Sequence, residues 1–435
     1  MQDTGRTCIR AIAKTRAEQI AYYRFLENPD VTSSILIDSL RVHCHQQLEG
    51  RHVLAISDTS EINLQAHAGR LNPEGQGVVG NNRDIGFFIH PTLIVDEISG
   101  LPLGLSNLQL WTRAFERPSK EERDYQSLAI EEKESYKWIA AATGSRECFD
   151  HSNVAQVTYV GDSESDIYEP WFQIPEEGVH LLVRACQDRR LVAHPQKLYD
   201  TLADQPIAGT YEVDIPADPR HHRTARRAKM TVRYTPVKLR RPDSLTDDYP
   251  KFASVNAIDV VELNPPEGEA PIHWRLLTTH DVNSYEQARQ IIQWYRWRWH
   301  IELLFATSKQ RGLEIESSQL ESVAGIQKLC IKALSVAITI LQLTLGRENR
   351  EETADVVFDS PRQMFLEHLL PTLEGRTTKQ KNPHPVRSLA WVAWLIARLG
   401  GWAGYRSQRP PGFKTMYRGL QQFEMMFSGW KLAAP

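Results

Sequence analysis

Three acidic residues of this sequence stand where a carboxylate can take part in chemistry. Asp58 ends the apolar run "HVLAISD", Asp162 ends the run "VAQVTYVGD", and Glu302 lies within "YRWRWHIELLFATSK". Carboxylate oxygens are ligands of hard divalent cations such as Mg²⁺, whose shell a phosphate substrate completes. Two such ions about 4 Å apart activate the attacking oxygen and stabilise the leaving oxygen in phosphoryl transfer. Acids at strand ends are also common turn and capping residues, so the three positions alone leave both interpretations open.

A stripe of polar and charged residues surrounds the third acid. Tyr295, Arg298, Glu302 and Lys309 are separated by 3, 4 and 7 residues. On an α-helix these offsets place all four side chains within roughly 60° of one face. A salt-bridged surface would accommodate the stripe, since Arg298 and Glu302 form an i,i+4 pair. A metal-bound phosphodiester explains more, because the acid would hold the cation while its basic neighbours and the phenol hold phosphate oxygens.

These residues need strands and helices to position them. The apolar runs at 52–60 and 154–162 predict buried strands, and carboxylates at their carboxyl ends would lie at the sheet edge where α/β sites gather. Ser284 predicts the start of one long helix that carries the stripe and stops near Gly312. Between 178 and 280, several β-branched runs predict further strands.

Composition narrows the class of protein. With 435 residues and a net charge of -3, the chain has no global cationic field, so contact with nucleic acid must come from local patches. Five dispersed cysteines fit a reduced, cytosolic protein, and the one His-Cys-His run, at 43–45, lacks the second ligand cluster of a zinc site. The polar N-terminus shows no signal peptide. The apolar run at 333–345 is short and contains Gln342, which predicts a buried helix rather than a membrane span.

The spacing Y-x2-R-x3-E-x6-K, with all four residues in register, resembles the signature of the IS-four family of bacterial DDE transposases, the group that includes the transposon-five transposase. Further similarity lies in "SDTS", "EKESYKW", "VGDSESDIYE", "NPPEGEAPIHWRLLTT" and "ARLGGWAGY". The resemblance covers the chain from about residue 18 onward. It implies an α/β fold with an RNase H-like mixed sheet, flanked by helices and interrupted by a β-rich insertion.

The resemblance also implies a division of the chain. The expected segments are a helical N-terminal segment (1–50), the first part of the RNase H-like core (51–177), a β-rich insertion (178–280), the part of the core with the catalytic-Glu helix (281–345), and a helical dimerisation region (346–435). Asp58, Asp162 and Glu302 would be the catalytic and metal-binding triad. It would hold two Mg²⁺ ions per site, with Mn²⁺ as a substitute and no small-molecule cofactor.

Several residues match DNA-binding positions of the family. Trp274 matches a tryptophan that stacks on a flipped base during hairpin formation. Tyr295, Arg298 and Lys309 match residues that hold the neighbouring phosphate, and Arg184 matches an arginine that contacts DNA. From the residues alone, a core tryptophan and a snorkelling arginine remain the alternatives for Trp274 and Arg184.

A basic arm lies within the expected insertion. Residues 219–242 contain nine Lys or Arg and no acid, and they include Arg226, Arg227 and Lys229. Phosphate contact with counterion release is the expected use of such an arm. A solvated, mobile loop is the alternative.

The expected function is cut-and-paste DNA transposition through a hairpin intermediate. The partners would be DNA and a second copy of the chain, without a membrane, in the bacterial cytoplasm at the nucleoid. The chain departs from the family at Ser163 and Ala306, where relatives often carry a basic residue, and it begins almost at the helix that follows the end-recognition segment. Two alternatives therefore stay open: a DNA-binding or dimerising inhibitor without turnover, and a metal-dependent DNA nuclease.

Overall fold

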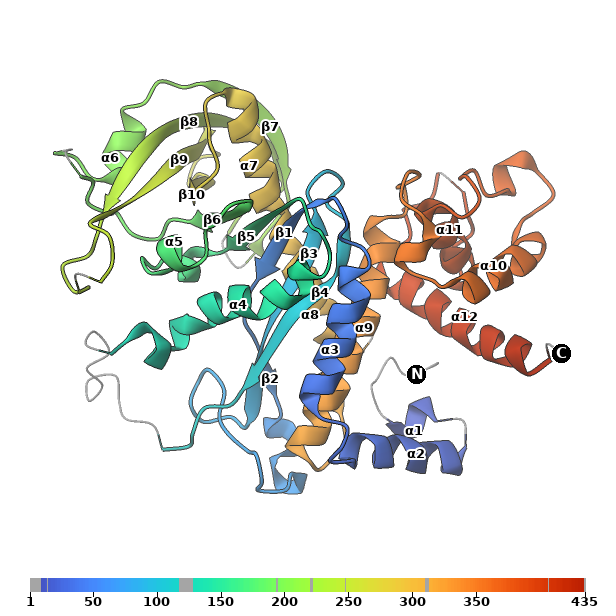
Figure 1. Cartoon of the computed structure of the whole chain (residues 1–435). Helices are drawn as coiled ribbons and strands as arrows, with labels where there is room; N and C mark the ends of the chain where they lie inside the picture. Colours follow the sequence, from blue (N-terminus) through green and yellow to red (C-terminus); the bar gives the residue numbers. More distant parts are fainter. Residues whose placement is uncertain are drawn as a thin grey trace. The chain divides into compact units, whose positions relative to one another are not determined.

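The computed structural model describes residues 9–13, 15–116, 128–192, 195–219, 222–246, 248–309, 313–405 and 407–433 (Figure 1). The chain forms two compact units. Unit 1 comprises Met1–Glu49, Thr59–Arg117 and Trp299–Pro435, and unit 2 comprises Gly50–Asp58 and Pro118–Arg298. Each unit therefore draws on segments that lie far apart in the sequence.

Unit 2 is built on seven described strands. They are β1 (His52–Ser57), β5 (Gln156–Gly161), β6 (Val179–Arg184), β7 (Gly209–Ile215), β8 (Arg226–Arg240), β9 (Phe252–Leu263) and β10 (His273–Thr278). Its helices are α4 (Lys137–Asp150), α5 (Pro170–Gln173), α6 (Leu198–Ala203) and α7 (Tyr285–Trp297). The strands lie in the order β1-β5-β6-β10-β9-β8-β7. The first three are mutually parallel and the remaining neighbours are antiparallel.

The parallel and antiparallel halves of this sheet differ in how deeply their residues are buried. Every residue of β1 after His52 is buried, as expected for a parallel strand that is covered on both faces. In β8 buried and exposed residues alternate over much of the strand, which is typical of an antiparallel strand with one solvated face. The prediction of strands between 178 and 280 is confirmed, and the first of them, β6, runs parallel to β5.

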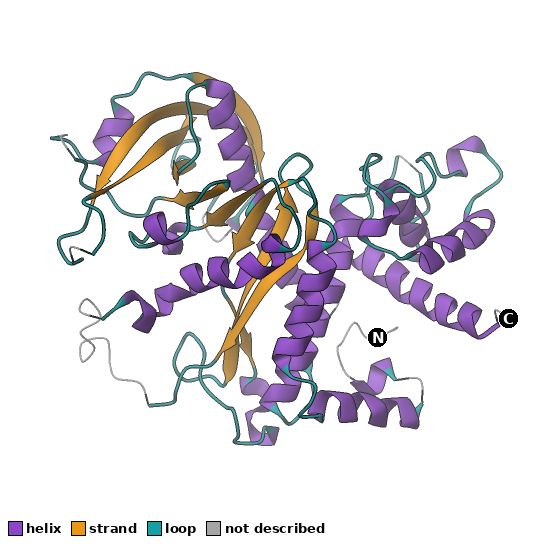
Figure 2. Ribbon diagram, in the orientation of Figure 1, coloured by secondary structure: helices purple, strands orange, loops and turns teal. Residues whose placement is uncertain are grey.

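Unit 1 contains an antiparallel group of strands and most of the described helices. Figure 2 distinguishes the helices of the chain from its strands by colour. The strands of unit 1 are β2 (Ser60–Asn63), β3 (Gly86–Asp96) and β4 (Pro102–Trp111). Its helices are α1 (Ile9–Ile12), α2 (Arg16–Glu27), α3 (Ser33–His45), α8 (Trp299–Lys309), α9 (Val323–Leu345), α10 (Ser360–Leu373), α11 (Leu389–Leu399) and α12 (Phe413–Ala433). β3 pairs with both β2 and β4, and α3 and α9 pack against β4.

Helix α9 is the central helix of unit 1. It is long and apolar enough to span a membrane by length and composition, yet 72% of its most apolar window is buried inside the structure. Two of its buried polar side chains reach other elements: the Lys328 ammonium donates to the carbonyls of Leu26 and Asn28, and Gln342 donates to the Leu103 carbonyl. The helix is therefore a core element, as the sequence predicts.

The order of strands along the chain matches the predicted fold class. β1 is followed by the antiparallel pair β3 and β4, and then by β5 and β6, with β1 parallel to β5 and β5 parallel to β6. Helices flank these strands. The protein is thus α/β with an RNase H-like mixed sheet, and the antiparallel strands β7 to β10 follow β6 as the β-rich addition.

Candidate active site

The two aspartates singled out by the sequence lie beside each other at the carboxyl ends of neighbouring strands of unit 2. Ile56 of β1 pairs with Val160 of β5 in parallel register. Asp58 and Asp162 each follow two residues later, so they stand at the same level on strands that are about 4.8 Å apart. The carboxyl edge of parallel strands is where α/β proteins place ligands.

Arg184 occupies the corresponding position on the third parallel strand, β6. Val160 also pairs with Leu182 of β6, and Arg184 is again two residues further on. The edge therefore carries two carboxylates and one guanidinium on adjacent strands. The Arg184 Nη2 donates to the His273 carbonyl at 3.4 Å, which links the side chain to the start of β10.

A tight turn fixes Asp162. Its Oδ1 accepts the Glu164 backbone N–H at 2.8 Å, and the Ser165 hydroxyl donates to its carbonyl at 2.7 Å. Gly161 is required here, because a Cβ at this position would lie 2.2 Å from the Ser165 hydroxyl. The predicted capping role and the predicted catalytic role of this aspartate are therefore compatible, since only one carboxylate oxygen receives this bond.

A buried ion pair joins the loops that follow β5 and β6. Asp166 accepts both Nε and Nη2 of Arg189, at 3.0 and 2.6 Å, and both side chains are almost fully buried. The other Asp166 oxygen accepts the backbone N–H groups of Cys186 and Gln187, at 2.9 and 3.3 Å. The pair thus holds the backbone beside Asp162 and Arg184. This ion pair was not predicted from the sequence, although "DSESD" shows a second acid four residues after the first.

The Arg298 side chain forms an ion pair with Asp58. Its Nη1 is 2.9 Å from the Asp58 Oδ2, and both side chains are mostly buried. Tyr295 is buried on the same helix, α7, and burial raises the pKa of its phenol. The guanidinium groups of Arg298 and Arg184 oppose this rise in pKa, while Asp162 adds to it. Tyr295 therefore lies within the electrostatic reach of three predicted site residues.

Trp274, at the start of β10, contacts the same tyrosine. The ring centroids of Trp274 and Tyr295 are 6.0 Å apart with an interplanar angle of 63°. The indole is half-buried rather than enclosed in the core. Unit 2 thus brings together six predicted residues: Asp58, Asp162, Arg184, Trp274, Tyr295 and Arg298.

The prediction of a single helix from 284 to about 312 is wrong, because the segment forms two helices. Helix α7 ends at Trp297 and α8 begins at Trp299, with Arg298 as the C-cap of α7. Ser284 caps the start as predicted, because its hydroxyl accepts the Gln287 backbone N–H. The expected end near Gly312 lies outside the described residues. Hydrophobic periodicity continues across the joint, which is why the sequence pattern did not reveal it.

Glu302 and Lys309 lie on α8, in unit 1. Glu302 is half-buried. The Lys309 ammonium donates to the Glu61 carbonyl and lies 3.5 Å from the Glu316 Oε1. Within unit 1 this lysine is therefore anchored to β2 and to the turn after α8.

The donor chemistry at the edge of β1 and β5 suits a hard divalent cation. Asp58 and Asp162 supply oxygen ligands, and Mg²⁺ is commonly bound by one or two carboxylates together with substrate phosphates. Among the residues that the structure describes, no group of three or more His, Cys, Asp or Glu side chains is close enough to hold a metal ion. The His-Cys-His run at 43–45 forms no such group either, and Cys44 is buried.

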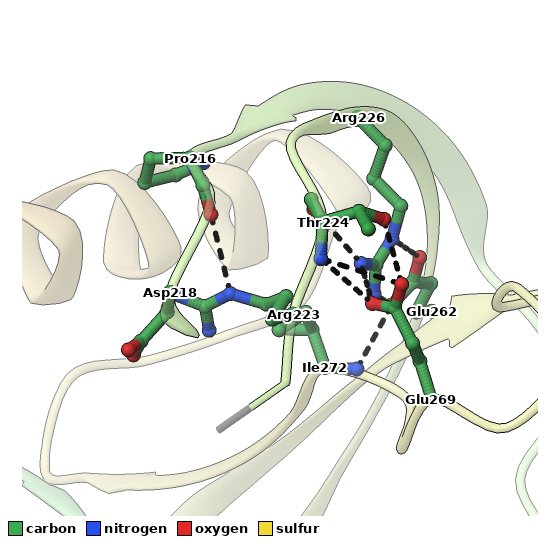
Figure 3. Close-up of polar contacts among 8 residues, drawn as sticks. All are labelled: Pro216, Asp218, Arg223, Thr224, Arg226, Glu262, Glu269 and Ile272. Carbon is green, nitrogen blue, oxygen red and sulfur yellow. Dashed lines mark hydrogen bonds and ion pairs between the residues drawn. The ribbon is translucent and has the colours of Figure 1, made fainter. Parts of the chain in front are cut away.

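The basic arm is largely a strand rather than a loop. From residue 226 to 240 it forms β8, while residues 220 and 221 lie outside the described part of the chain. Arg226 pairs with Glu262 at 2.7 Å and with Glu269 at 2.5 Å (Figure 3). Arg227 pairs with Glu212 at 2.7 Å. The acids that neutralise the arm lie outside its sequence, so the prediction of DNA contact by Arg226 and Arg227 is not supported by their contacts. Lys229 is exposed.

Residues 143–338 match the family model described as "Transposase DDE domain". This match supports a DDE transposase. The matched region contains Asp162 and Glu302, together with Trp274, Tyr295, Arg298, Lys309 and the strands of the β-rich addition.

One solved structure matches this chain at low similarity. It is described as "Cryo-EM structure of piggyBac transposase synaptic complex with hairpin DNA (SNHP)", with a TM-score of 0.38 and 9% sequence identity. The similarity covers 92% of this chain and 57% of that chain. This protein thus spans little more than half the length of that transposase.

Proposed function

We propose that this protein is a cut-and-paste DNA transposase of the IS-four family, with Asp58, Asp162 and Glu302 as its metal-binding carboxylates. The observation that carries the proposal is the placement of Asp58 and Asp162 two residues beyond the paired Ile56 and Val160, on adjacent parallel strands. The match of residues 143–338 to a transposase DDE domain supports the same chemistry.

The carboxylates would hold divalent cations, Mg²⁺ or in its place Mn²⁺, two per site. When bound, these ions activate an oxygen nucleophile and neutralise charge that develops on the phosphate. The carboxylate of Asp58 is already oriented by Arg298, and that of Asp162 by its own turn. Oriented ligands of this kind reduce the reorganisation that binding requires.

The neighbouring side chains would hold and orient DNA. Arg184, Arg298 and Lys309 offer charge-assisted donors to phosphate oxygens, and the Tyr295 hydroxyl offers a neutral donor. Lys229, exposed on β8, would add a contact with the backbone. The half-buried Trp274 would stack on an unpaired base, replacing the stacking that the base loses when it leaves the duplex.

The reaction would be a series of in-line displacements at phosphorus. Water breaks a P–O bond at the element's end and frees a 3′-OH. That hydroxyl attacks the opposite strand and forms a hairpin, and a second water opens it. The freed 3′-OH then attacks target DNA. Each step forms one P–O bond and breaks one, so no covalent protein–DNA intermediate is needed.

Transposition also requires that two DNA ends are held together. We propose that the helical part from 346 to 435 contacts a second copy of the chain in the DNA complex. The protein would act in the bacterial cytoplasm on the chromosome. In this part of the chain, α10 and α12 pack through aromatic side chains, with Phe365 of α10 against Phe423 and Phe427 of α12.

The direct test is incubation of the purified chain with Mg²⁺ and DNA that carries the inverted repeats flanking its reading frame. Nicks, hairpins and strand-transfer products together support a transposase. Nicks and hairpins without strand transfer favour a nuclease. Binding without any nick favours an inhibitor, and either of the last two results overturns the proposal.

A further inference from the structure

A row of charged side chains crosses three strands of unit 2, apart from the candidate active site. Arg275 of β10 pairs in register with Asp259 of β9, and Asp259 pairs with Arg233 of β8. Residues directly opposite each other in antiparallel strands point to the same face. The three side chains therefore stand side by side on one face of the sheet.

The Asp259 carboxylate lies near three basic side chains. The Asp259 Oδ1 lies 2.7 Å from the His273 Nε2 and 3.6 Å from the Arg275 Nε, and its Oδ2 lies 3.7 Å from an Arg233 Nη1. Asp259 is 5% exposed at its side chain, while Arg275 and Arg233 are 27% and 22% exposed. Two guanidinium charges against one carboxylate leave a surplus of positive charge in the row.

Contacts other than those with Asp259 hold the two arginines in place. The Asp259 carboxylate does not pair with all of their hydrogen-bond donors. The Arg275 guanidinium lies 3.8 Å from the centroid of the Tyr199 ring, which fixes its plane. Within the described part of the chain, the Arg275 Nε has no hydrogen-bond partner. The Arg233 Nε donates to the Gln205 carbonyl at 3.0 Å, which leaves its terminal nitrogens to the shared acid and to solvent. A planar, oriented guanidinium suits bidentate binding of phosphate.

The Arg226 cluster shows the opposite balance of charge. There one guanidinium faces two carboxylates, Glu262 and Glu269, and hydrogen bonds to both hold it in place (Figure 3). Thr224 and the Ile272 backbone N–H add further bonds to these acids. This cluster would repel phosphate, whereas the row of Arg275, Asp259 and Arg233 would attract it.

We propose that Arg275 and Arg233 form a binding site for the phosphate backbone of duplex DNA. The inference rests on the proposed function, because it names the site through which the β-rich addition holds the substrate. Asp259 orients the two guanidinium groups and the phosphates replace it as their closest anion. The basic arm thus contributes through Arg233 rather than through Arg226 and Arg227.

The test is the salt dependence of binding to a fluorescent duplex of random sequence. Each phosphate contact adds about 0.9 to the slope of log K against log salt concentration. Arg275→Gln and Arg233→Gln should each flatten the slope by about 0.9, and the double variant by about 1.8. Arg227→Gln, on the same strand but paired with Glu212, should leave the slope unchanged. Unchanged slopes in the Arg275 and Arg233 variants would overturn the site.

A second variant has the opposite expected effect. Asp259→Asn removes the only carboxylate of the row and should tighten duplex binding by about threefold. Weaker or equal binding by a folded Asp259→Asn protein, with folding checked by thermal denaturation, contradicts the inference. If the wild-type chain binds no duplex at all, the result contradicts the proposed function and, with it, the site. If it binds and cleaves while all slopes stay equal, only the site at Arg275 and Arg233 fails.

Discussion

Arg298 and Asp58 are 240 residues apart in the sequence, and their side chains form an ion pair with 2.9 Å between Nη1 and Oδ2. Both side chains are mostly buried, at 15% and 14% exposure. The guanidinium therefore supplies the positive charge that a carboxylate at this depth needs. A cation bound at Asp58 would share the carboxylate with Arg298 or release the guanidinium toward DNA.

Arg298→Gln should destabilise the protein and make it respond more strongly to metal. Loss of a hydrogen bond to a charged, mostly buried partner costs about 1–3 kcal/mol. Mg²⁺ should raise the melting temperature of the variant more than that of the wild type, because the ion replaces the missing charge. Thermal denaturation with and without Mg²⁺ measures both effects. Arg227→Gln, which breaks an exposed pair, should change stability by less than about 1 kcal/mol. Equal responses of Arg298→Gln and wild type to Mg²⁺ would argue against metal binding at Asp58.

Trp274→Ala should slow hairpin formation more than first-strand nicking. Stacking of a base on an aromatic side chain is worth about 1–3 kcal/mol, which corresponds to about 5- to 150-fold in rate when the interaction is made only in the hairpin step. Single-turnover assays on intact and on pre-nicked DNA separate the two steps. Trp274→Phe keeps a stacking surface and should retain most of the rate. Equal slowing of both steps would refute the base-stacking role.

Asp166→Asn should be strongly destabilising, because it leaves the guanidinium of Arg189 buried without its counter-charge. Removal of one partner of a buried pair costs about 3–5 kcal/mol. Urea denaturation measures the change in the free energy of unfolding. Asp243→Asn is the matched control, since its side chain is 72% exposed and its pair with Arg240 should contribute less than about 1 kcal/mol. Similar losses in the two variants would mean that the Asp166 pair does not hold the loops beside Asp162.

The stability of unit 2 should fall in acid because of a buried histidine cluster. His280 accepts or donates a bond at 2.7 Å to the Thr158 hydroxyl and stacks on His180 at 3.8 Å between ring centroids. Burial, with added repulsion from His180 and His52, lowers the pKa of His280 from 6.5 to about 3. Between these two values the unfolded chain binds a proton that the folded chain does not, so stability decreases as pH falls from 6.5 toward 3.

His280→Asn should make this decline less steep. One histidine contributes at most about 1.4 kcal/mol for each pH unit within the window. Denaturation midpoints across pH 4 to 7, taken on wild type and variant, measure the difference. His151→Asn, a change at an exposed histidine, should leave the wild-type profile intact. A His280→Asn profile as steep as that of the wild type would assign the acid sensitivity elsewhere.

The placement of the two aspartates could be predicted from the sequence because the physical signal is local. Apolar runs before Asp58 and Asp162 indicate buried strands, and a carboxylate at the end of such a strand emerges at the sheet edge. Ser284 and Gln287 likewise marked the start of α7 through capping, which depends on neighbouring residues alone.

The contacts that reach across the chain could not be predicted in the same way. Arg226 looked available for DNA because no acid lies nearby in the sequence, yet Glu262 and Glu269 approach it once β8 and β9 pair. The pairing of Asp58 with Arg298 depends on the fold for the same reason. The joint at Arg298 between α7 and α8 was missed because both helices share one continuous apolar pattern.

The most direct test of the metal-dependent mechanism is strand cleavage by Glu302→Gln. The substitution keeps the shape of the side chain and removes the charge that holds a cation. With Mg²⁺ and DNA carrying the element's ends, wild type should nick the DNA, and the variant should be slower by about 100-fold or more, while its affinity for the same DNA stays within about twofold of wild type. Cleavage by Glu302→Gln at the wild-type rate would contradict the account, because it would remove the third carboxylate from the reaction.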